Sequence, residues 1–359
     1  MPSSKSKELL LYLTRIGIGN SGLCPIPDNF DWEGLQALAT EQGLTAIVVD
    51  GLEKLPASQK PPKPVLLQWI GEILQGYEYR YELYRRAIAE LAAFYNDHNL
   101  KMMVLKGYAC SLDWPKPEHR PCGDIDIWQF GQQKEADTVL AKEKGVEIDN
   151  SHHHHTIFYW RDFMVENHYD FDNVYARKSN RELEPIFKDL GKDDSYTIDL
   201  YGEKVYLPSP NLHALFLIRH MVTHFTSTEL NMRQLLDWGF FVRAHSREID
   251  WKWLNGILDT YHMKEFFNCI NAICVEDLGF EVKSFPIVQF SPELKERILN
   301  DTLSPEFKGE EPRGLIARTL FKYKRWQANA WKQTLCYRES RWSTFWSGVV
   351  NHMIKPSSI

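Results

Sequence analysis

The spacing of hydrophobic residues changes twice along this 359-residue chain, and these changes restrict its fold. Residues 1–100 repeat apolar positions every three or four residues, most continuously over 65–98, which predicts amphipathic helices. Residues 101–207 contain short apolar runs and strict alternations, which are typical of strands. Helical spacing then returns over 208–359. The order predicts an α+β protein: a core with a small mixed sheet flanked by helices, between helical N-terminal and C-terminal regions.

The central region contains several strand signals. KMMVL (101–105) and DIDIWQF (124–130) are single candidate strands, and a helix is expected near 132–144. Two hairpins follow, one with its turn at 161–162 and one around Gly202. The core at 101–207 therefore has enough predicted strands to form one sheet.

The alternation in GDIDIWQF (123–130) places two aspartates on one face of a predicted strand. Asp124 and Asp126 point the same way, while Ile125 and Ile127 point to the other face. A carboxylate is costly to bury without a partner, so a bound cation is the first explanation for this pair. An exposed strand face is the alternative.

A third carboxylate lies on a later predicted strand. Glu166 has His168 on its own face, and it meets the two aspartates if the two strands are neighbours. Three hard oxygen donors on a rigid sheet suit Mg²⁺, with Mn²⁺ as an alternative, and two ions about 3.5–4 Å apart can promote an in-line phosphoryl displacement. Asp170 and Asp172 have the same parity as Glu166 and are open as substitutes.

Three residues near the aspartates suit phosphate binding. Lys106 and Gly107 stand at an expected strand-to-helix turn, where glycine lets the backbone approach an anion and helix N–H groups favour it. Arg120, in the loop before the aspartates, is expected to hold a phosphate with its guanidinium fork. Ordinary surface charge is the alternative for the lysine and the arginine.

The order of these residues resembles a family of largely uncharacterised bacterial nucleotidyltransferases within the DNA polymerase β-like superfamily, over roughly residues 65–260. The shared pattern is a Lys-Gly turn, an Arg, a Gly-Asp-x-Asp strand, an acidic-x-His strand and a His-rich helix before a Leu-Asp pair. The residues that carry it here are Lys106, Gly107, Arg120, Gly123, Asp124, Asp126, Glu166, His168, His220, His224, Leu236 and Asp237.

The resemblance implies a Mg²⁺-dependent enzyme that moves a nucleoside monophosphate from an NTP to an acceptor hydroxyl and releases pyrophosphate. It implies that Asp124, Asp126 and Glu166 bind two metal ions and that Glu166 accepts the proton of the attacking hydroxyl. The residues expected to hold the nucleotide are Lys106, Gly107, Arg120, Gly123, His168, His220 and His224. Asp237 is more typical of an ion-pair partner on a helix, and the acceptor and the preferred base stay open.

Two other functions are open. The wider superfamily has Ser after the glycine of the turn, where this chain has Tyr108, so a non-catalytic nucleotide-binding or interaction module is one alternative. The other is a histidine-based metallohydrolase, because His213, His220 and His224 are spaced at seven and four on one predicted helix. No Glu follows His220, so the metalloprotease motif is absent.

Four consecutive histidines at 152–155 lead into a predicted strand. Alternate rings are expected to face opposite ways along that strand. Two of them would reach a bound triphosphate if the strand borders the site. The sequence favours loop or sheet-surface positions for these histidines.

The stretch 318–348 interleaves basic residues with Trp and Tyr, which is the one sequence signal for RNA or a membrane surface. The formal net charge of the chain is −6. Residues 315–355 hold eight Lys/Arg and one Glu, so the rest of the chain has a formal net charge of −13, and packing of this stretch on an acidic body is favoured. The cysteines form no C-x-x-C pair, and no apolar run has the length of a signal peptide or a membrane span. These features predict a cytoplasmic protein.

Overall fold

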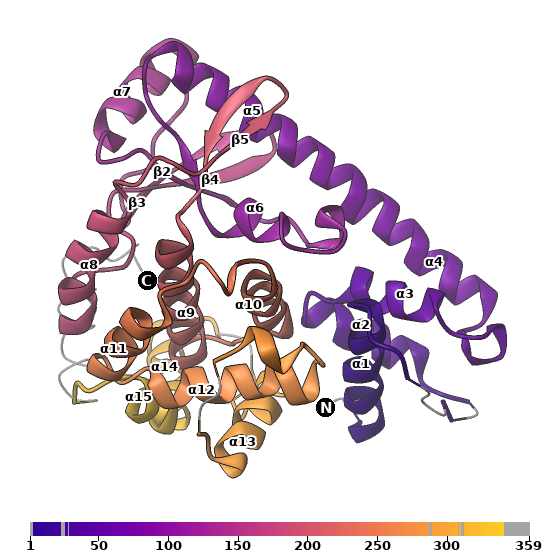
Figure 1. Ribbon diagram of the computed structural model, residues 1–359. Helices are drawn as coiled ribbons and strands as arrows, with labels where there is room; N and C mark the ends of the chain where they lie inside the picture. The colour runs from indigo at the N-terminus through magenta and orange to yellow at the C-terminus, as the bar shows by residue number, and fades with distance from the viewer. Residues whose placement is uncertain are drawn as a thin grey trace.

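The structure is a computed structural model that describes residues 3–22, 26–27, 29–286, 289–307, 309 and 312–340. It confirms the α+β class, with a six-stranded mixed sheet set among helices (Figure 1). In that view the sheet lies at the top, most C-terminal helices lie below it, and the first three helices lie at the lower right.

The sheet has the strand order β3-β4-β2-β1-β6-β5. The strands are β1 (Met103–Val104), β2 (Ile125–Trp128), β3 (His155–Trp160), β4 (Phe163–His168), β5 (Thr197–Leu200) and β6 (Glu203–Tyr206). The two predicted hairpins are present as β3-β4 and β5-β6, and Arg161, Tyr201 and Gly202 adopt positive φ in their turns. β2 pairs with β4, and β1 with β6, in the parallel direction.

One helical column links the first helices to the sheet. It consists of α4 (Lys63–Ile73), a π-helical segment (Leu74–Tyr79) and α5 (Arg80–Asp97). The column confirms the single helix expected over 65–98, and Figure 1 shows it running diagonally up to the sheet. The π-helical segment leaves no mark in the hydrophobic spacing, because the flanking α-helical repeats continue on both sides of it.

The two faces of the sheet pack against different layers. Ile125 of β2 and Val165 of β4 share a hydrophobic cluster with α5 and with α7 (Gln133–Lys144), the helix expected near 132–144. Trp128 belongs to the cluster of the C-terminal helices instead. Because side chains alternate along a strand, Asp126 shares the face of Trp128 and lies toward those helices.

The first three helices share their core with the C-terminal part of the chain. They are α1 (Ser4–Gly17), α2 (Trp32–Glu41) and α3 (Thr45–Glu53). The side chain of Asp31 accepts a hydrogen bond from the backbone N–H of Gly34 and caps α2. Gln42 donates to the carbonyl oxygen of Thr302 and accepts from the backbone N–H of Met232. The two ends of the described chain therefore form one helical body.

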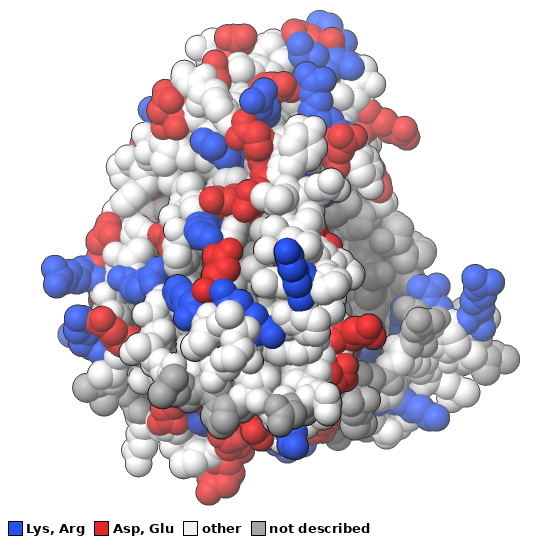
Figure 2. Space-filling model, turned by 90° about the vertical axis from the view of Figure 1, so that its right-hand side faces the viewer, with Lys and Arg blue, Asp and Glu red and all other residues white. Residues whose placement is uncertain are grey.

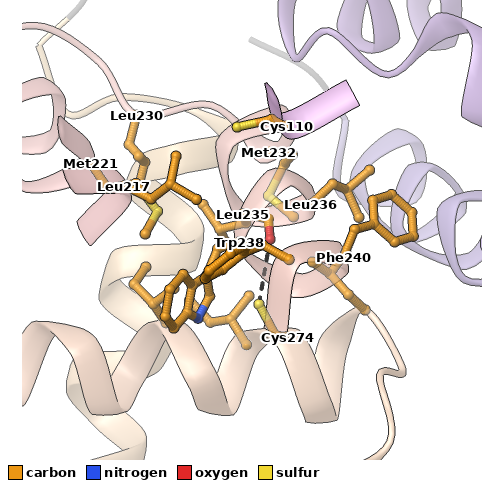
Figure 3. Close-up of a cluster of buried hydrophobic side chains, with 14 of the residues drawn as sticks. Cys110, Leu217, Met221, Leu230, Met232, Leu235, Leu236, Trp238, Phe240 and Cys274 are labelled. Carbon is orange, nitrogen blue, oxygen red and sulfur yellow. Dashed lines mark hydrogen bonds between the residues drawn. The ribbon is translucent and has the colours of Figure 1, made fainter. Parts of the chain in front are cut away.

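The rest of that body consists of α8 (Lys178–Leu190), α9 (Pro210–Ser227), α10 (Met232–His245), α11 (Trp251–Thr260), α12 (Lys264–Ala272), α13 (Pro292–Leu303), α14 (Leu315–Ala328) and α15 (Ala330–Cys336). α10 is its central helix. Leu235, Leu236 and Trp238 are buried in a cluster that Leu217 of α9 joins, and the thiol of Cys274 donates to the carbonyl oxygen of Leu235 (Figure 3).

The described part of the basic C-terminal stretch packs on this body at α15. Lys332 forms a buried ion pair with Asp301, and the ring of Trp331 contacts that of Phe225 with centroids 5.3 Å apart. At α15 this agrees with packing on an acidic body, whereas Leu320 and Tyr323 of α14 are 55% and 41% exposed. The rest of the stretch, residues 341–348, lies outside the described residues.

The distribution of surface charge and the lengths of the helices test whether the protein has a basic surface or a membrane-spanning helix. On the face shown in Figure 2, Lys and Arg side chains lie among Asp and Glu side chains rather than in one basic field. Within the described ranges, no helix is both long and apolar enough to cross a membrane.

Candidate active site

Two carboxylates meet where β2 and β4 run side by side. The register of these parallel strands pairs Asp126 directly with Glu166. The two strands are therefore neighbours, which the meeting of these carboxylates requires. One carboxylate oxygen of each residue and one ring nitrogen of His168 lie within 4.8 Å of one another. Asp126 is only 2% exposed. The sheet therefore presents two carboxylates and an imidazole as a donor set for a cation.

Lys106 pairs with the buried aspartate. It begins α6 (Lys106–Ser111) directly after β1, with a φ of 30°, which is strained for a residue with a Cβ. Its ammonium lies 2.6 Å from Asp126 Oδ1 and 5.5 Å from the ring centroid of Phe216. Burial opposes its charge, but Asp126 and Glu166 raise the pKa of Lys106 above its ordinary value, so the side chain stays protonated.

His168 contacts both carboxylates through one nitrogen. Its Nε2 lies 3.0 Å from Asp126 Oδ1 and 3.6 Å from Glu166 Oε2. Its Nδ1 lies 3.2 Å from the carbonyl oxygen of Asp170, which can only accept a hydrogen bond. Nδ1 therefore carries a hydrogen, and Nε2 is the nitrogen directed at the carboxylates.

Asp170 and Asp172 do not substitute for Glu166. β4 ends at His168, so the alternation of a strand no longer applies beyond it. The carboxylate of Asp170 pairs with Lys188, and that of Asp172 accepts from Arg219 Nε at 2.7 Å. The two aspartates instead fasten α8 and α9 to the end of the sheet.

The two central carboxylates have different affinities for a proton. Burial opposes ionisation of Asp126, but Lys106 and His168 hold its pKa well below the usual range. Burial, together with the negative charges of Asp126 and Asp124, raises the pKa of Glu166 to about 6. A divalent cation would relieve this repulsion, and carboxylate oxygens are the donors that Mg²⁺ and Mn²⁺ prefer. The residues present therefore fit the expected metal.

Asp124 lies at the edge of this group, just before β2. It is partly exposed, and its charge acts on the pKa values of Glu166 and Lys106, so it is near both. Its carboxylate does not belong to the donor group of Asp126, Glu166 and His168. Its backbone carbonyl accepts a hydrogen bond from the hydroxyl of Tyr84 at 2.7 Å.

The two glycines of the motif have different surroundings. A Cβ on Gly107 would lie 2.7 Å from the hydroxyl of Tyr84 and 3.4 Å from the carbonyl oxygen of Asp124. Gly107 therefore permits the close approach of α5 to the start of β2. Gly123 is exposed and a Cβ there would meet open space.

Arg120 has a protein partner where a phosphate contact is expected. Its Nε and Nη2 donate to the two carboxylate oxygens of Asp237 at 2.8 and 2.9 Å, and the pair is buried. Trp114 Nε1 donates to the same carboxylate at 2.9 Å. Because Asp237 already occupies this edge of the guanidinium, the structure shows Arg120 joining the core to α10. The interpretation of Asp237 as an ion-pair partner is confirmed.

The histidines of α9 separate into two groups. His220 and His224 lie across from the carboxylates, with their Nε2 atoms 3.1 Å apart, and the charge of Lys106 acts on both. His213 is buried elsewhere, with its Nε2 3.6 Å from Cys110 Sγ. Seven residues of helix span about 10.5 Å, so alignment on one face does not bring these rings together. Among the described residues, the clusters of side chains that could hold a metal ion do not include His213, His220 and His224 together. The metallohydrolase alternative therefore lacks its set of metal ligands.

His154 and His155 lie beside the site, although the sequence analysis favoured loop or sheet-surface positions for the run 152–155 over approach to the site. Residues 152–154 form a bend before β3, so strand alternation does not apply, and the rings of His154 and His155 both lie near His168. His155 is also directly opposite His168 in the β3-β4 hairpin. A two-residue turn at 161–162 sets this register, so the pairing could have been read from the hairpin signal.

The fold and the site define a nucleotidyltransferase-type protein, and comparison of the sequence agrees. A family described as "Uncharacterised nucleotidyltransferase" matches residues 28–279. The match covers more than half of the chain, so the protein belongs to this family.

Two further comparisons add context. The structure of an antigenic nucleotidyltransferase-like protein from Paracoccidioides brasiliensis is similar at 16% sequence identity and a TM-score of 0.34, over 49% of this chain and 85% of that one. A comparison with curated proteins finds no match.

Proposed function

We propose that this protein transfers a nucleoside monophosphate from an NTP to an acceptor hydroxyl, at a Mg²⁺ site formed by Asp124, Asp126 and Glu166, and releases pyrophosphate. The observation that carries the proposal is the direct pairing of Asp126 with Glu166 across β2 and β4. The family membership supports it. When bound, the metal would polarise the reacting phosphate and neutralise charge that develops on the leaving group.

Glu166 is the general base in this proposal. In the metal-free protein, burial and the charges of Asp126 and Asp124 raise the pKa of Glu166 to about 6, which makes it the more basic of the two paired carboxylates; a bound cation would lower this pKa. The base would take the proton of the acceptor hydroxyl as that oxygen attacks the α-phosphate. Asp126, whose pKa is depressed, stays ionised as a metal ligand.

The chain supplies positive charge and imidazole groups for the nucleotide. The buried ammonium of Lys106 stands at the start of α6 and would hold a phosphate oxygen. In this proposal, His220 and His224 on α9 would line the opposite side of the nucleotide; their Nε2 atoms are 3.1 Å apart, and the charges of Lys106 and Asp126 act on His220. Arg120 acts in this proposal through Asp237, by holding α10 against the core.

The first test is calorimetric titration of ATP, GTP, CTP and UTP in the presence of Mg²⁺, with wild type and Asp124→Asn. We expect Mg²⁺-dependent binding of at least one nucleotide, and a loss of about 100-fold or more in Asp124→Asn, because a metal ligand becomes neutral. The matched control is Asp162→Asn, an exposed residue in the β3-β4 turn, which should bind like wild type. Unchanged nucleotide binding by Asp124→Asn would remove Asp124 from the proposed site, and unchanged binding by Asp126→Asn as well would refute the site itself.

A second candidate function is nucleotide binding without turnover. Tyr108, which follows the Lys-Gly turn, is 2% exposed and packs beside Tyr81 and Tyr84, so no serine-like hydroxyl is offered at this position. Pyrophosphate release with the bound nucleotide and a panel of acceptor hydroxyls separates the two functions. Turnover that disappears in Asp126→Asn supports transfer, whereas tight Mg²⁺-dependent binding with no release for any acceptor supports the binding module.

A further inference from the structure

Three histidine rings form a second donor group beside the carboxylates. His154, His155 and His168 each place one ring nitrogen within 4.8 Å of the other two. The ring centroids of His154 and His155 are 4.3 Å apart, and they lie 5.7 and 5.3 Å from that of His168. The β3-β4 register holds His155 opposite His168, so the hairpin builds the group.

The nitrogens of this group are buried without enough partners. His155 is 5% exposed, and neither of its ring nitrogens has a hydrogen-bond partner; Nδ1 of His154 has none either. The nearest carboxylate oxygen, Glu166 Oε2, lies 3.9 Å from His155 Nδ1, which is too far for a hydrogen bond. Buried polar groups are normally paired, so these nitrogens indicate a ligand that the protein itself does not provide.

We propose that His154, His155 and His168 bind a divalent transition-metal ion, with Zn²⁺ as the leading candidate, at a site adjacent to the Mg²⁺ carboxylates. Imidazole nitrogens favour Zn²⁺, Co²⁺, Ni²⁺ and Cu²⁺, whereas Mg²⁺ favours oxygen. Three histidines with an open fourth position are a ligand set that zinc uses. The inference goes beyond nucleotidyl transfer and does not depend on it.

The surroundings of the three rings suit such an ion. His168 donates through Nδ1 to the carbonyl oxygen of Asp170, which orients the ring. Its Nε2 lies 3.0 Å from Asp126 Oδ1 and would exchange this contact for the ion. Glu166 lies close enough to offset the charge of the ion. Zn–N bonds of about 2.0–2.1 Å bring ligand nitrogens closer together than the 4.8 Å within which these three lie, so a bound ion would draw the rings inward.

The test is titration of the full chain, stripped of metal by a chelator, with Co²⁺, followed by competition with Zn²⁺ and with excess Mg²⁺. The readout is the visible absorption of Co²⁺, which becomes stronger when the ion leaves its six-coordinate aqua complex for a four- or five-coordinate protein site, and it needs no activity assay. We expect one saturable Co²⁺ per chain that Zn²⁺ displaces and Mg²⁺ does not. His154→Gln and His155→Gln should each weaken Co²⁺ binding by about 100-fold or more, because each removes a direct ligand.

Two controls make the result specific. His152→Gln changes a histidine of the same run that is not in the donor group, and it should bind Co²⁺ like wild type. Asp124→Asn should also keep Co²⁺ binding, even though it is the variant expected to lose Mg²⁺-dependent nucleotide binding. Failure of one site is thereby distinguished from failure of the other.

Each remaining outcome overturns the inference. Wild-type Co²⁺ affinity in both His154→Gln and His155→Gln would show that these rings bind no metal. Loss in Asp124→Asn with retention in the histidine variants would place the ion at the carboxylates alone. Circular dichroism in the presence of chelator checks that the variants are folded, and His154, which is only partly buried, carries the smaller risk of misfolding.

Discussion

Among single residues, Gly107 shows how closely α5 approaches the start of β2. The hydroxyl of Tyr84 on α5 reaches the carbonyl oxygen of Asp124 only because Gly107 has no side chain. The glycine of the Lys-Gly turn therefore has a packing role in addition to the phosphate role that the sequence suggests. This contact positions the start of β2, and with it the aspartates.

Gly107→Ala should lower the free energy of unfolding by about 1–3 kcal/mol, because the new Cβ displaces the Tyr84 hydroxyl and leaves a buried carbonyl oxygen unpaired. Urea denaturation measures the change. In a Tyr84→Phe background the same substitution should cost less, since the displaced oxygen is already gone. Gly123→Ala, where a Cβ meets open space, is the matched control; an equal cost at both glycines would contradict the explanation.

Asp124 and Asp126 also differ at the scale of single residues: Asp126 is buried in the donor group, whereas Asp124 is partly exposed at its edge. Both were predicted to share a strand face, and Asp126 is where the pattern places it, but its partners Lys106 and His168 are distant in sequence. Periodicity predicts which face a residue occupies. It does not predict which side chain of another element lies there, and the same limit explains why the partner of Arg120 was missed.

At the scale of elements, local signals predicted most of what is present. Alternation and turn residues predicted the two hairpins, and helical spacing predicted the column from 65 to 98. The sequence analysis could not predict that β2 and β4 are neighbours and had to assume it for Glu166 to meet the aspartates. Alternation of polar and apolar residues is compatible with many strand orders. The packing of α1, α2 and α3 against helices from the far end of the chain was likewise beyond any local signal.

The end of α10 is tied to the loop after α6 by a titratable contact. His245 Nε2 lies 3.1 Å from Asp113 Oδ1, and its Nδ1 lies 2.9 Å from Glu248 Oε1. Hydrogen bonding to Asp113, together with the charge of Glu248, raises the pKa of His245 to about 9. Since the unfolded value is about 6.5, this stabilisation is complete below about pH 6.5 and is lost as the pH rises through about 9.

His245→Gln should therefore lower the free energy of unfolding by about 1–2 kcal/mol at pH 6, after allowance for the third of the side chain that water reaches. The difference from wild type should shrink toward pH 10, because the wild-type histidine is then neutral. Urea denaturation at the two pH values measures it. A pH-independent difference would mean that packing, rather than charge, is what the substitution removes.

At the scale of the whole molecule, the segment that forms the sheet lies, in the sequence, between the two groups of helices that together form one helical body. α1, α2 and α3 pack on the C-terminal helices, while α5 packs on the sheet. The boundary predicted near residue 100 separates α5 from the strands that it covers. It groups α5 with α1, α2 and α3, which pack on the C-terminal helices instead. The ion pair of Arg120 with Asp237 is a main polar link between the sheet region and α10.

Asp237→Asn should lower the free energy of unfolding by about 3–5 kcal/mol, because it leaves the buried guanidinium of Arg120 without a charged partner. Asp259→Asn is the matched control: that carboxylate is exposed and lies 3.4 Å from Lys264 Nζ, so its loss should cost about 0–1 kcal/mol. Urea denaturation compares the two variants. Similar costs would show that the buried pair contributes little to holding α10 on the sheet region.

The packing of Gln42 on Thr302 and Met232 has a consequence for biosynthesis. Thr302 follows Gln42 by 260 residues, so the surface that α2 is to cover does not exist until most of the chain has left the ribosome. The long α4-α5 column and the β-hairpins contain their partners nearby and can form first. The helices α1, α2 and α3 are thus synthesised before the surface that they finally cover, and until that surface is available their apolar faces can pack only on one another.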